Sequence, residues 1–416
     1  MPTIKDLNQI FAPKQSSSAA IVTGFQTMVN GISTDLNQIF EPKQTSSTDI
    51  TGFQTIVNGI STDLNQFFQP IGWVQTSSTS QDWSSIASDS TGQYLAAVVY
   101  NGYIYTSNNY GINWTQQTSS TIQNWFYIAS NSTGQYLAAV VSGGYIYTSN
   151  NYGITWTQRT TSTSQFWTSI ASDITGQYLV ATVEFGYIYT SNNYGANWTQ
   201  QTSSTSQDWS SIASDSTGQY LVAVVYNQYI YTSNNFGSTW TQQISNYWKS
   251  IASDSTGQYL AAGEYLGYIY TYKSSINWKK TSSTNQQWTS IASDITGQYL
   301  AAVVSGGYIY TSNNYGSTWN QQPLSTIQNW YSISSDSTGQ YLAAVVYGGY
   351  IYTSTNYGIN WTQQPSSTSQ FWSSIASDST GQNLAAVVYE LGIFPGYIYT
   401  SNNALAQPTG FLVETI

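Results

Sequence analysis

The sequence predicts an all-β fold, an eight-bladed β-propeller of four-stranded antiparallel blades with a small irregular N-terminal repeat arm. The first observation is a tryptophan-initiated segment that recurs in steps of 42, 42, 42, 39, 40, 42 and 42 residues. A fixed period in this range is typical of solenoids, propellers and arrays. The second is that each copy divides into four short strand-like segments, and the third is that none has helical apolar spacing. The tryptophans that open the copies are Trp83, Trp125, Trp167, Trp209, Trp248, Trp288, Trp330 and Trp372.

The first copy shows why four strands are expected. Its segments are Trp83–Ser88, Tyr94–Tyr100, Tyr103–Thr106 and Ile112–Gln116. The second is a continuous apolar run bounded by turn residues, which is typical of a strand buried on both faces. The Asn101-Gly102 pair is a strong hairpin signal. Four antiparallel strands in about 42 residues match one propeller blade.

The turn between the third and fourth segments carries a recurring motif. Ser107, Asn109, Gly111 and Trp114 fit the pattern Ser-x-Asp-x-Gly-x-x-Trp, with Asn in place of Asp. It resembles the Asp-box, or bacterial neuraminidase repeat, of sialidase-like and sortilin-like β-propellers. We interpret the motif structurally: the short side chain caps the turn, glycine takes a left-handed conformation and tryptophan packs beneath. It recurs at Ser149/Asn151/Gly153/Trp156, Ser191/Asn193/Gly195/Trp198, Ser233/Asn235/Gly237/Trp240, Ser312/Asn314/Gly316/Trp319 and Ser354/Asn356/Gly358/Trp361.

The blade count depends on Trp73. The eighth copy ends without its fourth-strand tryptophan, whereas Trp73 lies in phase, 41 residues before Trp114. We therefore expect the strand at Trp73 to complete the last blade and close the ring, which leaves no open end. The alternative is seven full blades and a spare unit. The predicted domains are an arm at 1–72, a propeller at 73–403 and a tail at 404–416.

Composition excludes several function classes. Only 6% of residues are charged, and the net charge is −10 with eight Lys plus Arg, which argues against nucleic-acid binding. The chain has neither Cys nor His, so we expect no metal site and no cofactor. No apolar run approaches the length of a membrane span. The start of the chain, Met1–Asp6, lacks the apolar core of a signal peptide, which leaves a cytoplasmic location as one alternative.

The arm repeats on a different period. Asp6–Phe11 returns as Asp35–Phe40 and Asp63–Phe68, a piece that suits one capped helical turn. Between the copies lie Thr23–Ser33 and Thr51–Ser61, which suit small hairpins. Units this short cannot bury a core alone. We interpret residues 1–72 as an anchor or assembly segment; the alternative is a loosely folded linker or a small pad on the propeller.

The Asp-Leu-x-x-Ile-Phe pieces are similar to repeats in structural proteins of large DNA viruses of algae and protists. The resemblance covers about 70 residues and implies a virion component. It implies other virion or assembly proteins as partners of the arm, and a homo-oligomer remains open.

No catalytic residue is predicted. Sialidases use an arginine triad, and Arg159 is the one arginine in this chain. Most aspartates occupy a single repeat position, and a group repeated in every blade is expected to cap a turn rather than to be a unique catalyst. These residues are Asp89, Asp173, Asp215, Asp254, Asp294, Asp336 and Asp378, with Asn131 once.

Positions that differ between copies are the candidate binding residues. The residue before each opening tryptophan and the turn between strands two and three are expected on one face, the variable face, which holds the ligand site in the sialidase-like family. The last of these turns contains an apolar insertion. Drift in unconstrained loops is the alternative. The candidates are Asp82, Asn124, Phe166, Asp208, Tyr247, Gln287, Asn329 and Phe371, with Leu391, Ile393 and Phe394 from the insertion.

The fifth copy has a broken Asp-box and four lysines: Lys249, Lys273, Lys279 and Lys280. A basic patch on an acidic protein indicates a docking edge; a degenerate blade with solvated lysines is the alternative. The hypothesis for the whole chain is a non-enzymatic structural or binding propeller of a virion. A glycan-binding lectin-like propeller is the alternative, and a divergent glycoside hydrolase is a third.

Overall fold

The computed structural model describes residues 26–29, 32–35, 54–57, 60–63, 72–274, 276–323, 325–389 and 396–401. The chain divides into two compact parts, Met1–Gln69 and Pro70–Ile416. In the first part, β1 (Gln26–Val29) pairs with β2 (Ile32–Asp35), and β3 (Gln54–Val57) pairs with β4 (Ile60–Asp63). Both expected hairpins are present. Their second strands extend to Asp35 and Asp63, which were predicted to begin two of the helical turns; the other residues of the predicted helical turns lie outside the described residues.

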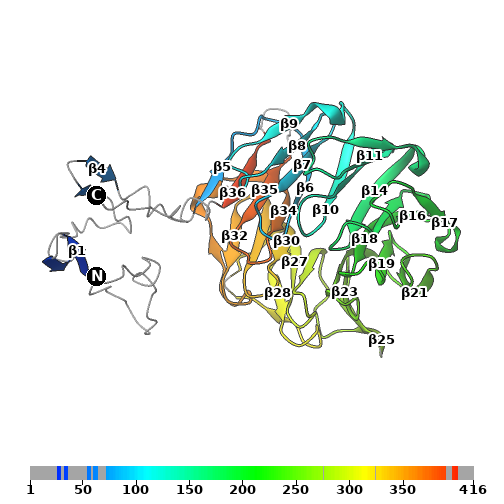
Figure 1. Cartoon of the computed structure of the whole chain (residues 1–416). Coiled ribbons are helices and arrows are strands. Elements are labelled where there is room, and N and C mark those ends of the chain that lie inside the picture. The colour runs from blue at the N-terminus through cyan, green and yellow to red at the C-terminus, as the bar shows by residue number, and fades with distance from the viewer. Residues whose placement is uncertain are drawn as a thin grey trace. The chain divides into compact units, whose positions relative to one another are not determined.

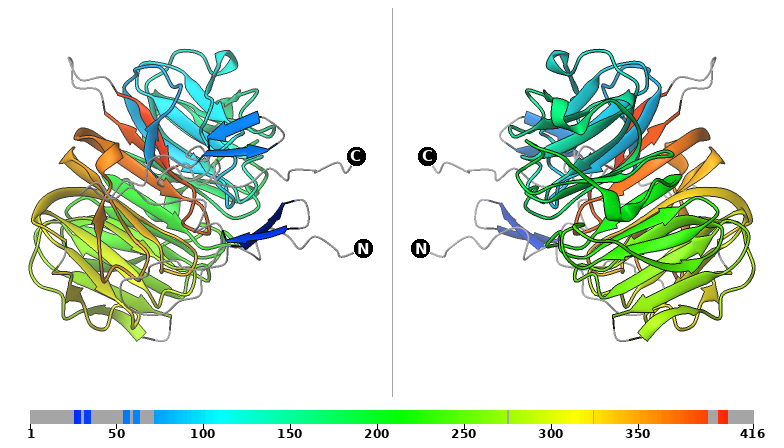
Figure 2. Two further views of the ribbon diagram at one scale, coloured as in Figure 1. Left: turned by 90° about the vertical axis from the view of Figure 1, so that its left-hand side faces the viewer. Right: turned by 90° about the vertical axis from the view of Figure 1, so that its right-hand side faces the viewer.

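The second part is all-β and is built from four-stranded antiparallel units (Figure 1). We number the repeats in chain order. Repeat 1 contains β6 (Trp83–Ser88), β7 (Leu95–Val99), β8 (Ile104–Ser107) and β9 (Thr115–Gln117), hydrogen-bonded in that order. Some neighbouring units are joined into larger sheets, because the second strand of repeats 2, 6 and 7 also pairs with the first strand of the next repeat. The first strand lies nearest the centre of the propeller and the fourth nearest its rim (Figure 1). In the side views the units follow one another in chain order, from cyan through green to yellow and orange (Figure 2).

The other repeats follow the same plan. Repeat 2 has β10 (Trp125–Ser130), β11 (Leu137–Gly144), β12 (Ile146–Ser149) and β13 (Thr157–Arg159). Repeat 3 has β14 (Gln165–Ser172), β15 (Leu179–Val183), β16 (Ile188–Ser191) and β17 (Thr199–Gln201). Repeat 4 has β18 (Trp209–Ser214), β19 (Leu221–Val225), β20 (Tyr229–Ser233) and β21 (Thr241–Ser245). Repeat 5 has β22 (Trp248–Ser253), β23 (Tyr259–Glu264), β24 (Ile269–Lys273) and β25 (Ile276–Lys280); repeat 6 has β26 (Trp288–Ser293), β27 (Leu300–Gly307), β28 (Ile309–Ser312) and β29 (Asn320–Gln321); repeat 7 has β30 (Gln328–Ser335), β31 (Leu342–Gly349), β32 (Ile351–Ser354) and β33 (Thr362–Gln363).

Repeat 8 takes its fourth strand from the start of the second part. It contains β34 (Gln370–Ser377), β35 (Leu384–Val388) and β36 (Ile398–Ser401), and β36 pairs antiparallel with β5 (Trp73–Gln75). The register joins Ser401 to Trp73 and Tyr399 to Gln75. This is the pairing that the in-phase position of Trp73 predicts.

Two features differ from the expected elements. The fourth strand of repeat 1 begins at Thr115 rather than Ile112, because the residues before it belong to the Asp-box turn, where Asn113 N–H donates to Asn109 Oδ1. In four repeats a 3-10 turn follows the fourth strand: Thr118–Ser120, Thr160–Ser162, Thr202–Ser204 and Pro365–Ser367. Its buried last serine accepts a hydrogen bond from a third-strand N–H, as Ser120 does from Ile104.

The core lies between neighbouring sheets. The second strand of each repeat contains a run of five buried residues, which in β7 is the whole strand and in β11 is followed by half-buried and exposed residues of the turn. The cluster around Trp125 joins Ala96, Val98 and Ile104 of repeat 1 to residues of repeat 2, and the cluster around Trp372 joins repeats 7 and 8 in the same way. Each sheet therefore buries both faces against its two neighbours, which explains the continuous apolar runs.

The neighbour contacts run in a closed order. Each first strand contacts the first strand of the next repeat, and β34 contacts β6. The turn after each first strand donates a backbone hydrogen bond to the same turn of the next repeat, beginning with Ser90 N–H to Ser132 O and ending with Ser379 N–H to Ser90 O. On the opposite face, Trp83 Nε1–H and Gln81 N–H of repeat 1 donate to Gly396 O of repeat 8.

Candidate functional site

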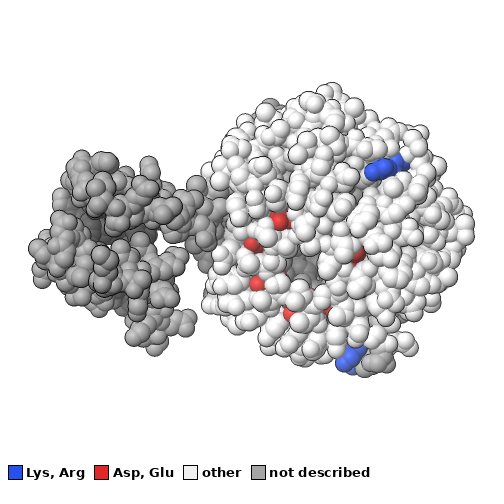
Figure 3. All heavy atoms as spheres, in the orientation of Figure 1, with Lys and Arg blue, Asp and Glu red and all other residues white. Residues whose placement is uncertain are grey.

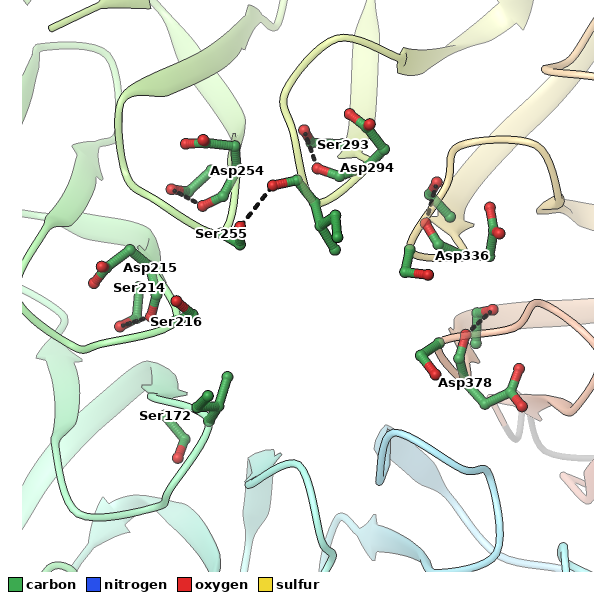
Figure 4. Close-up of a pocket in the computed structure, with 17 residues that line it drawn as sticks. Ser172, Ser214, Asp215, Ser216, Asp254, Ser255, Ser293, Asp294, Asp336 and Asp378 are labelled. Carbon is green, nitrogen blue, oxygen red and sulfur yellow. Dashed lines mark hydrogen bonds between the residues drawn. The ribbon is translucent and has the colours of Figure 1, made fainter.

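The turns that bear the repeated aspartates surround the mouth of the central channel on one face. A shallow depression of about 340 Å³ is lined there by serine and aspartate residues of repeats 3 to 8. Acidic side chains encircle the central opening in the space-filling view (Figure 3). In the close-up, Asp215, Asp254, Asp294, Asp336 and Asp378 each belong to a separate turn at this mouth (Figure 4).

Each of these carboxylates is engaged in its own turn. Asp89 is typical: one oxygen accepts from Tyr94 N–H and the other from the Thr91 hydroxyl. The side chains of all seven repeated aspartates and of Asn131 are buried and make equivalent bonds. A carboxylate that satisfies backbone and hydroxyl donors within one turn holds that turn together. Among the described residues, no three His, Cys, Asp or Glu side chains gather as metal ligands.

The Asp-box turns have the geometry that their residues predict. Ser107 Oγ accepts from Gly111 N–H, and Asn109 Oδ1 accepts from Asn113 N–H. Gly111 has φ +77°, and a Cβ there would lie 2.4 Å from Thr400 Cγ2 of the neighbouring repeat. Glycine is therefore required both by conformation and by the close approach of repeats.

The Asp-box tryptophans lie in the core. Trp156 is 7% exposed and Trp114 is half-buried. Trp156 packs against Trp125 with ring centroids 6.4 Å apart. The aromatic residue before the Asp-box glycine stacks on the preceding repeat, as Tyr152 does on Tyr94 at 4.4 Å. Asn151 and Gly153 repeat the bonds of the first turn, so these residues are structural.

The variable face lies at the other ends of the strands. In seven repeats the residue before the opening tryptophan is bonded to the turn between strands two and three of its own repeat: Tyr100 N–H donates to Asp82 O, and Tyr226 N–H donates to Asp208 O. The same bond joins Ser142 to Asn124, Glu184 to Phe166, Tyr265 to Tyr247, Ser305 to Gln287 and Tyr389 to Phe371. The two variable positions therefore lie together, as the sequence predicts.

None of the eight predicted residues before the tryptophans is buried, and Phe166 is 60% exposed. Asn124 and Asn329 are also exposed, and Asp82, Asp208, Tyr247, Gln287 and Phe371 are half-buried. The predicted insertion residues Leu391, Ile393 and Phe394 lie outside the described residues. Burial raises the pKa of the Asp208 carboxyl.

Tyrosines form a contact series across repeats 4 to 6 of this face. The Tyr247 ring lies 4.9 Å from that of Tyr226 and 5.3 Å from that of Tyr265. The Tyr226 and Tyr247 hydroxyls are hydrogen-bonded, and this bond raises the pKa of Tyr247 to about 12. The Gln287 amide donates to the Tyr265 hydroxyl at 2.7 Å.

A second aromatic series crosses repeats 7, 8 and 1. Tyr347 lies 5.8 Å from Tyr331 and 5.1 Å from Phe371. Tyr389 follows in the next turn. The pKa of the Tyr389 hydroxyl is raised, mainly by the negative charge of Asp82.

The turn tyrosines were not among the residues predicted for binding. The signal that could have found them is the change from Ser to Tyr at the first turn position: Ser142 and Ser305 occupy it in repeats 2 and 6, whereas Tyr100, Tyr226 and Tyr347 occupy it elsewhere.

The four lysines of repeat 5 do not form one patch. Lys249 lies on β22 and Lys279 and Lys280 on β25, at opposite edges of a four-stranded sheet, so about three strand spacings of ~4.8 Å separate them. Lys280 Nζ lies 3.2 Å from the centroid of the Tyr268 ring, and Lys273 Nζ lies 5.2 Å from that of Tyr259. A docking edge could thus include Lys279 and Lys280 but not Lys249.

Comparisons with known proteins support this architecture. The family model described as BNR-Asp box repeat matches residues 104–117 and 351–364. No sequence among the curated proteins matches the chain. No helix among the described residues is both long and apolar enough to cross a bilayer.

The similar solved structures share the fold at low identity. YCF48 from Cyanidioschyzon merolae is 13% identical with a TM-score of 0.54, covering 79% of this chain and 98% of that one. The C-terminal WD40 domain of Sif2 is 11% identical with a TM-score of 0.61, covering 79% and 97%. The GH74 xyloglucanase from Xanthomonas campestris is 15% identical with a TM-score of 0.53, covering 78% of this chain and 60% of that one. The chain thus carries BNR-Asp box repeats on a β-propeller architecture.

Proposed function

We propose that this Asp-box protein is a non-enzymatic binding propeller, closed as a ring of eight blades, that holds its ligand on the variable face and is attached through residues 1–72. The eight-blade count is supported by two observations. The pairing of β5 with β36 gives the last repeat four strands. The turn-to-turn hydrogen bonds pass through every repeat and return from Ser379 to Ser90.

The observation that carries the binding function is the contrast between the two faces. On the Asp-turn face every repeated carboxylate is buried and bonded within its own turn. On the variable face, tyrosine and phenylalanine side chains are exposed in neighbouring repeats, with Tyr331 47% and Phe185 72% exposed. Aromatic side chains such as Tyr152 and Tyr315 are also exposed on the Asp-box face, but each stacks on the preceding repeat in the same way. The aromatic residues of the variable face differ from repeat to repeat and reach higher exposure, and such groups mark an interaction surface.

The absence of catalysis is a proposal that the repeated aspartates support, because each is engaged in its own turn. Glycoside hydrolysis needs two carboxyl groups about 5–10 Å apart on either side of the scissile bond. The carboxylates of the variable face with described side chains are Asp82, Glu184 and Asp208. Glu184 and Asp208 belong to adjoining repeats that are joined by the bridge between Gly186 and Gln207, so this is the pair that a test of catalysis must include. Glu264 is buried and accepts a hydrogen bond from Tyr268 N–H.

A glycan and a peptide are the two candidate ligands. The contact between the Gln287 amide and the Tyr265 hydroxyl favours a glycan, because amide groups beside aromatic rings suit both hydrogen bonding to and stacking on a sugar. A second solved structure, YCF48 bound to D1 peptide, shares the fold at 12% identity with a TM-score of 0.51, covering 79% of this chain and 94% of that one. That structure is the parallel for a peptide as the ligand of this propeller.

Screening the full chain on glycan and peptide arrays tests the binding proposal. The test variant is Tyr226→Ser/Tyr347→Ser on the variable face, and the matched control is Tyr152→Ser/Tyr315→Ser on the Asp-box face. We expect the first pair to lose the bound ligands and the second to keep them. Turnover of any bound glycan, abolished by Glu184→Gln or by Asp208→Asn, would refute the non-enzymatic proposal.

A virion location is supported by the arm repeats alone. It predicts that the protein is found by mass spectrometry in purified particles, and that deleting residues 1–69 removes it from them. Its absence from such particles would refute the virion role without affecting the binding proposal.

A further inference from the structure

We propose that the ligand is an extended polypeptide segment with lysine or arginine side chains, laid across the variable face from repeat 2 to repeat 6. The inference rests on the proposed function because it uses the same face. It adds the chemical class of the ligand and the line along which the ligand lies.

Exposed and half-buried aromatic residues of this face form two arcs. Arc A spans repeats 7, 8 and 1 and contains Tyr331, Tyr347, Phe371, Tyr389 and Tyr100. Arc B spans repeats 3, 4 and 5 and contains Phe166, Phe185, Tyr226, Tyr247 and Tyr265. In the closed order of contacts each arc occupies three consecutive repeats, so the arcs lie on opposite sides of the channel. Phe126 on β10 of repeat 2 occupies the position that Tyr331 has in repeat 7 and lies outside both arcs, although it is 43% exposed.

Repeats 2 and 6 separate the arcs. Both carry a Ser-Gly-Gly turn, at 142–144 and at 305–307, where other repeats carry tyrosine or phenylalanine. The middle glycines, Gly143 and Gly306, have positive φ and are exposed. The residues beside them pair with the next repeat, as Ser142 does with Phe166 and Ser305 with Asn329, so the accessible backbone is at the tips of the two turns. The two repeats lie four apart in the order of contacts, at opposite sides of the channel. A strip that joins these two turns therefore crosses the face between the two arcs, which form its walls, and Phe126 is an exposed aromatic residue of the repeat at one end.

The shape of this strip suits an extended chain. A polypeptide can donate to and accept from the exposed backbone of the two turns, and it can place side chains alternately toward each wall. A compact ligand would contact one wall and leave the other unused.

The charges of the walls favour cationic side chains. Arc A holds Asp82 beside Tyr389, and arc B holds Glu184 and Asp208. Neither arc includes a Lys or Arg residue. Two cations of the described residues lie near this face: Lys249 on β22, and Lys280, whose Nζ is 3.2 Å from the centroid of the Tyr268 ring. An ammonium or guanidinium group gains from the ring faces and from the carboxylates together. A neutral glycan would use the rings but would gain little from the carboxylate charge.

Fluorescence anisotropy of labelled peptides added to the full chain tests the inference. The probes are a lysine-rich peptide and its glutamine- and glutamate-substituted counterparts of equal length; cellohexaose competes as the glycan probe. We expect the lysine peptide to bind at least about tenfold more tightly than the glutamine peptide, which corresponds to ~1.4 kcal/mol. Its affinity should fall as salt is raised.

Two variants assign the binding to the face. Asp82→Asn/Asp208→Asn removes charge at constant shape and should weaken the lysine peptide alone by about tenfold. Tyr226→Ala/Tyr347→Ala removes one ring from each wall and should weaken every bound probe. Tyr152→Ala/Tyr315→Ala on the Asp-box face is the control, and unchanged melting shows that each variant is folded.

The outcomes separate the inference from the proposed function. Equal affinity for the three peptides, or no binding of the lysine peptide, overturns the inference. Cellohexaose binding that the tyrosine variant abolishes overturns the inference but keeps the variable face as the binding site. Lysine-peptide binding that neither variable-face variant changes overturns both.

Discussion

Removing the strand that completes repeat 8 should destabilise the whole ring. Trp73 is 3% exposed and packs in one cluster with Trp372 and Tyr399. A tryptophan buries about 150–250 Å², so at ~25 cal/mol per Å² its burial stabilises the fold by at most about 4–6 kcal/mol. Deleting residues 1–76 also removes the β5–β36 pairing and the bond from Thr76 N–H to Ile398 O. Deleting residues 1–70 removes neither.

The assay is thermal unfolding of the two truncated proteins side by side. The ring spans about 330 residues, and unfolding entropy of ~2.1 cal/mol/K per residue gives about 0.7 kcal/mol/K. A loss of about 4–6 kcal/mol then lowers the Tm by roughly 6–9 °C. Trp73→Ala in the full chain should give a similar fall without any truncation. Equal Tm values for the two truncations would refute the closure of the ring by β5.

Four substitutions test the other structural claims. Trp156→Ala should cost about 3–5 kcal/mol in denaturant unfolding, since it leaves a cavity beside Trp125; a loss below ~1 kcal/mol would contradict its burial. Gly153→Ala should lower the free energy of unfolding by at least about 1–2 kcal/mol, because φ is +78° and the new Cβ would lie 2.5 Å from Thr106 Cγ2. Gly143→Ala is the matched control: φ is +73° there, but the new Cβ would have no contact under 3.4 Å, so the loss should be smaller. Burial raises the pKa of the Glu264 carboxyl, so this group keeps its proton to a higher pH in the folded state than in the unfolded state. The stability of the fold therefore falls as the pH rises above the usual pKa range of glutamate. Glu264→Gln should therefore be at least as stable as the parent at neutral pH and lose less stability between about pH 4 and 7; a lower Tm at neutral pH would contradict the direction of the shift.

Much of the fold follows from the sequence because each repeat specifies the same local structure. The β6 strand coincides with the predicted Trp83–Ser88, and the buried run around Val98 is β7. Trp73 could be assigned to the fourth strand of the last repeat from its position in the sequence alone, since the Asp-box tryptophans recur with the period of the repeats. The capping role of Asp89 was also predictable, because a group present in every repeat must serve what every repeat shares.

The rest depends on contacts between repeats. The start of the fourth strand was misplaced because Asn109 holds Asn113 in the turn, a bond that apolar patterning does not reveal. The two aromatic arcs could not be recognised from single positions, since Tyr226 and Tyr247 belong to different repeats. The separation of Lys249 from Lys279 likewise appears only when their strands are placed at opposite edges of one sheet.

The junction between Trp73 and Ser401 has a mechanical consequence. The chain enters and leaves the ring at adjacent residues of one antiparallel pair. Tension on an anchored arm therefore reaches the propeller at β5, a strand of three residues held by β36 and by the Trp73 side chain. Under an applied pulling force, β5 should dissociate from β36 before the strands of any other repeat separate. The other repeats would then unfold in order from this end, so the β5–β36 pairing sets the force that the propeller withstands.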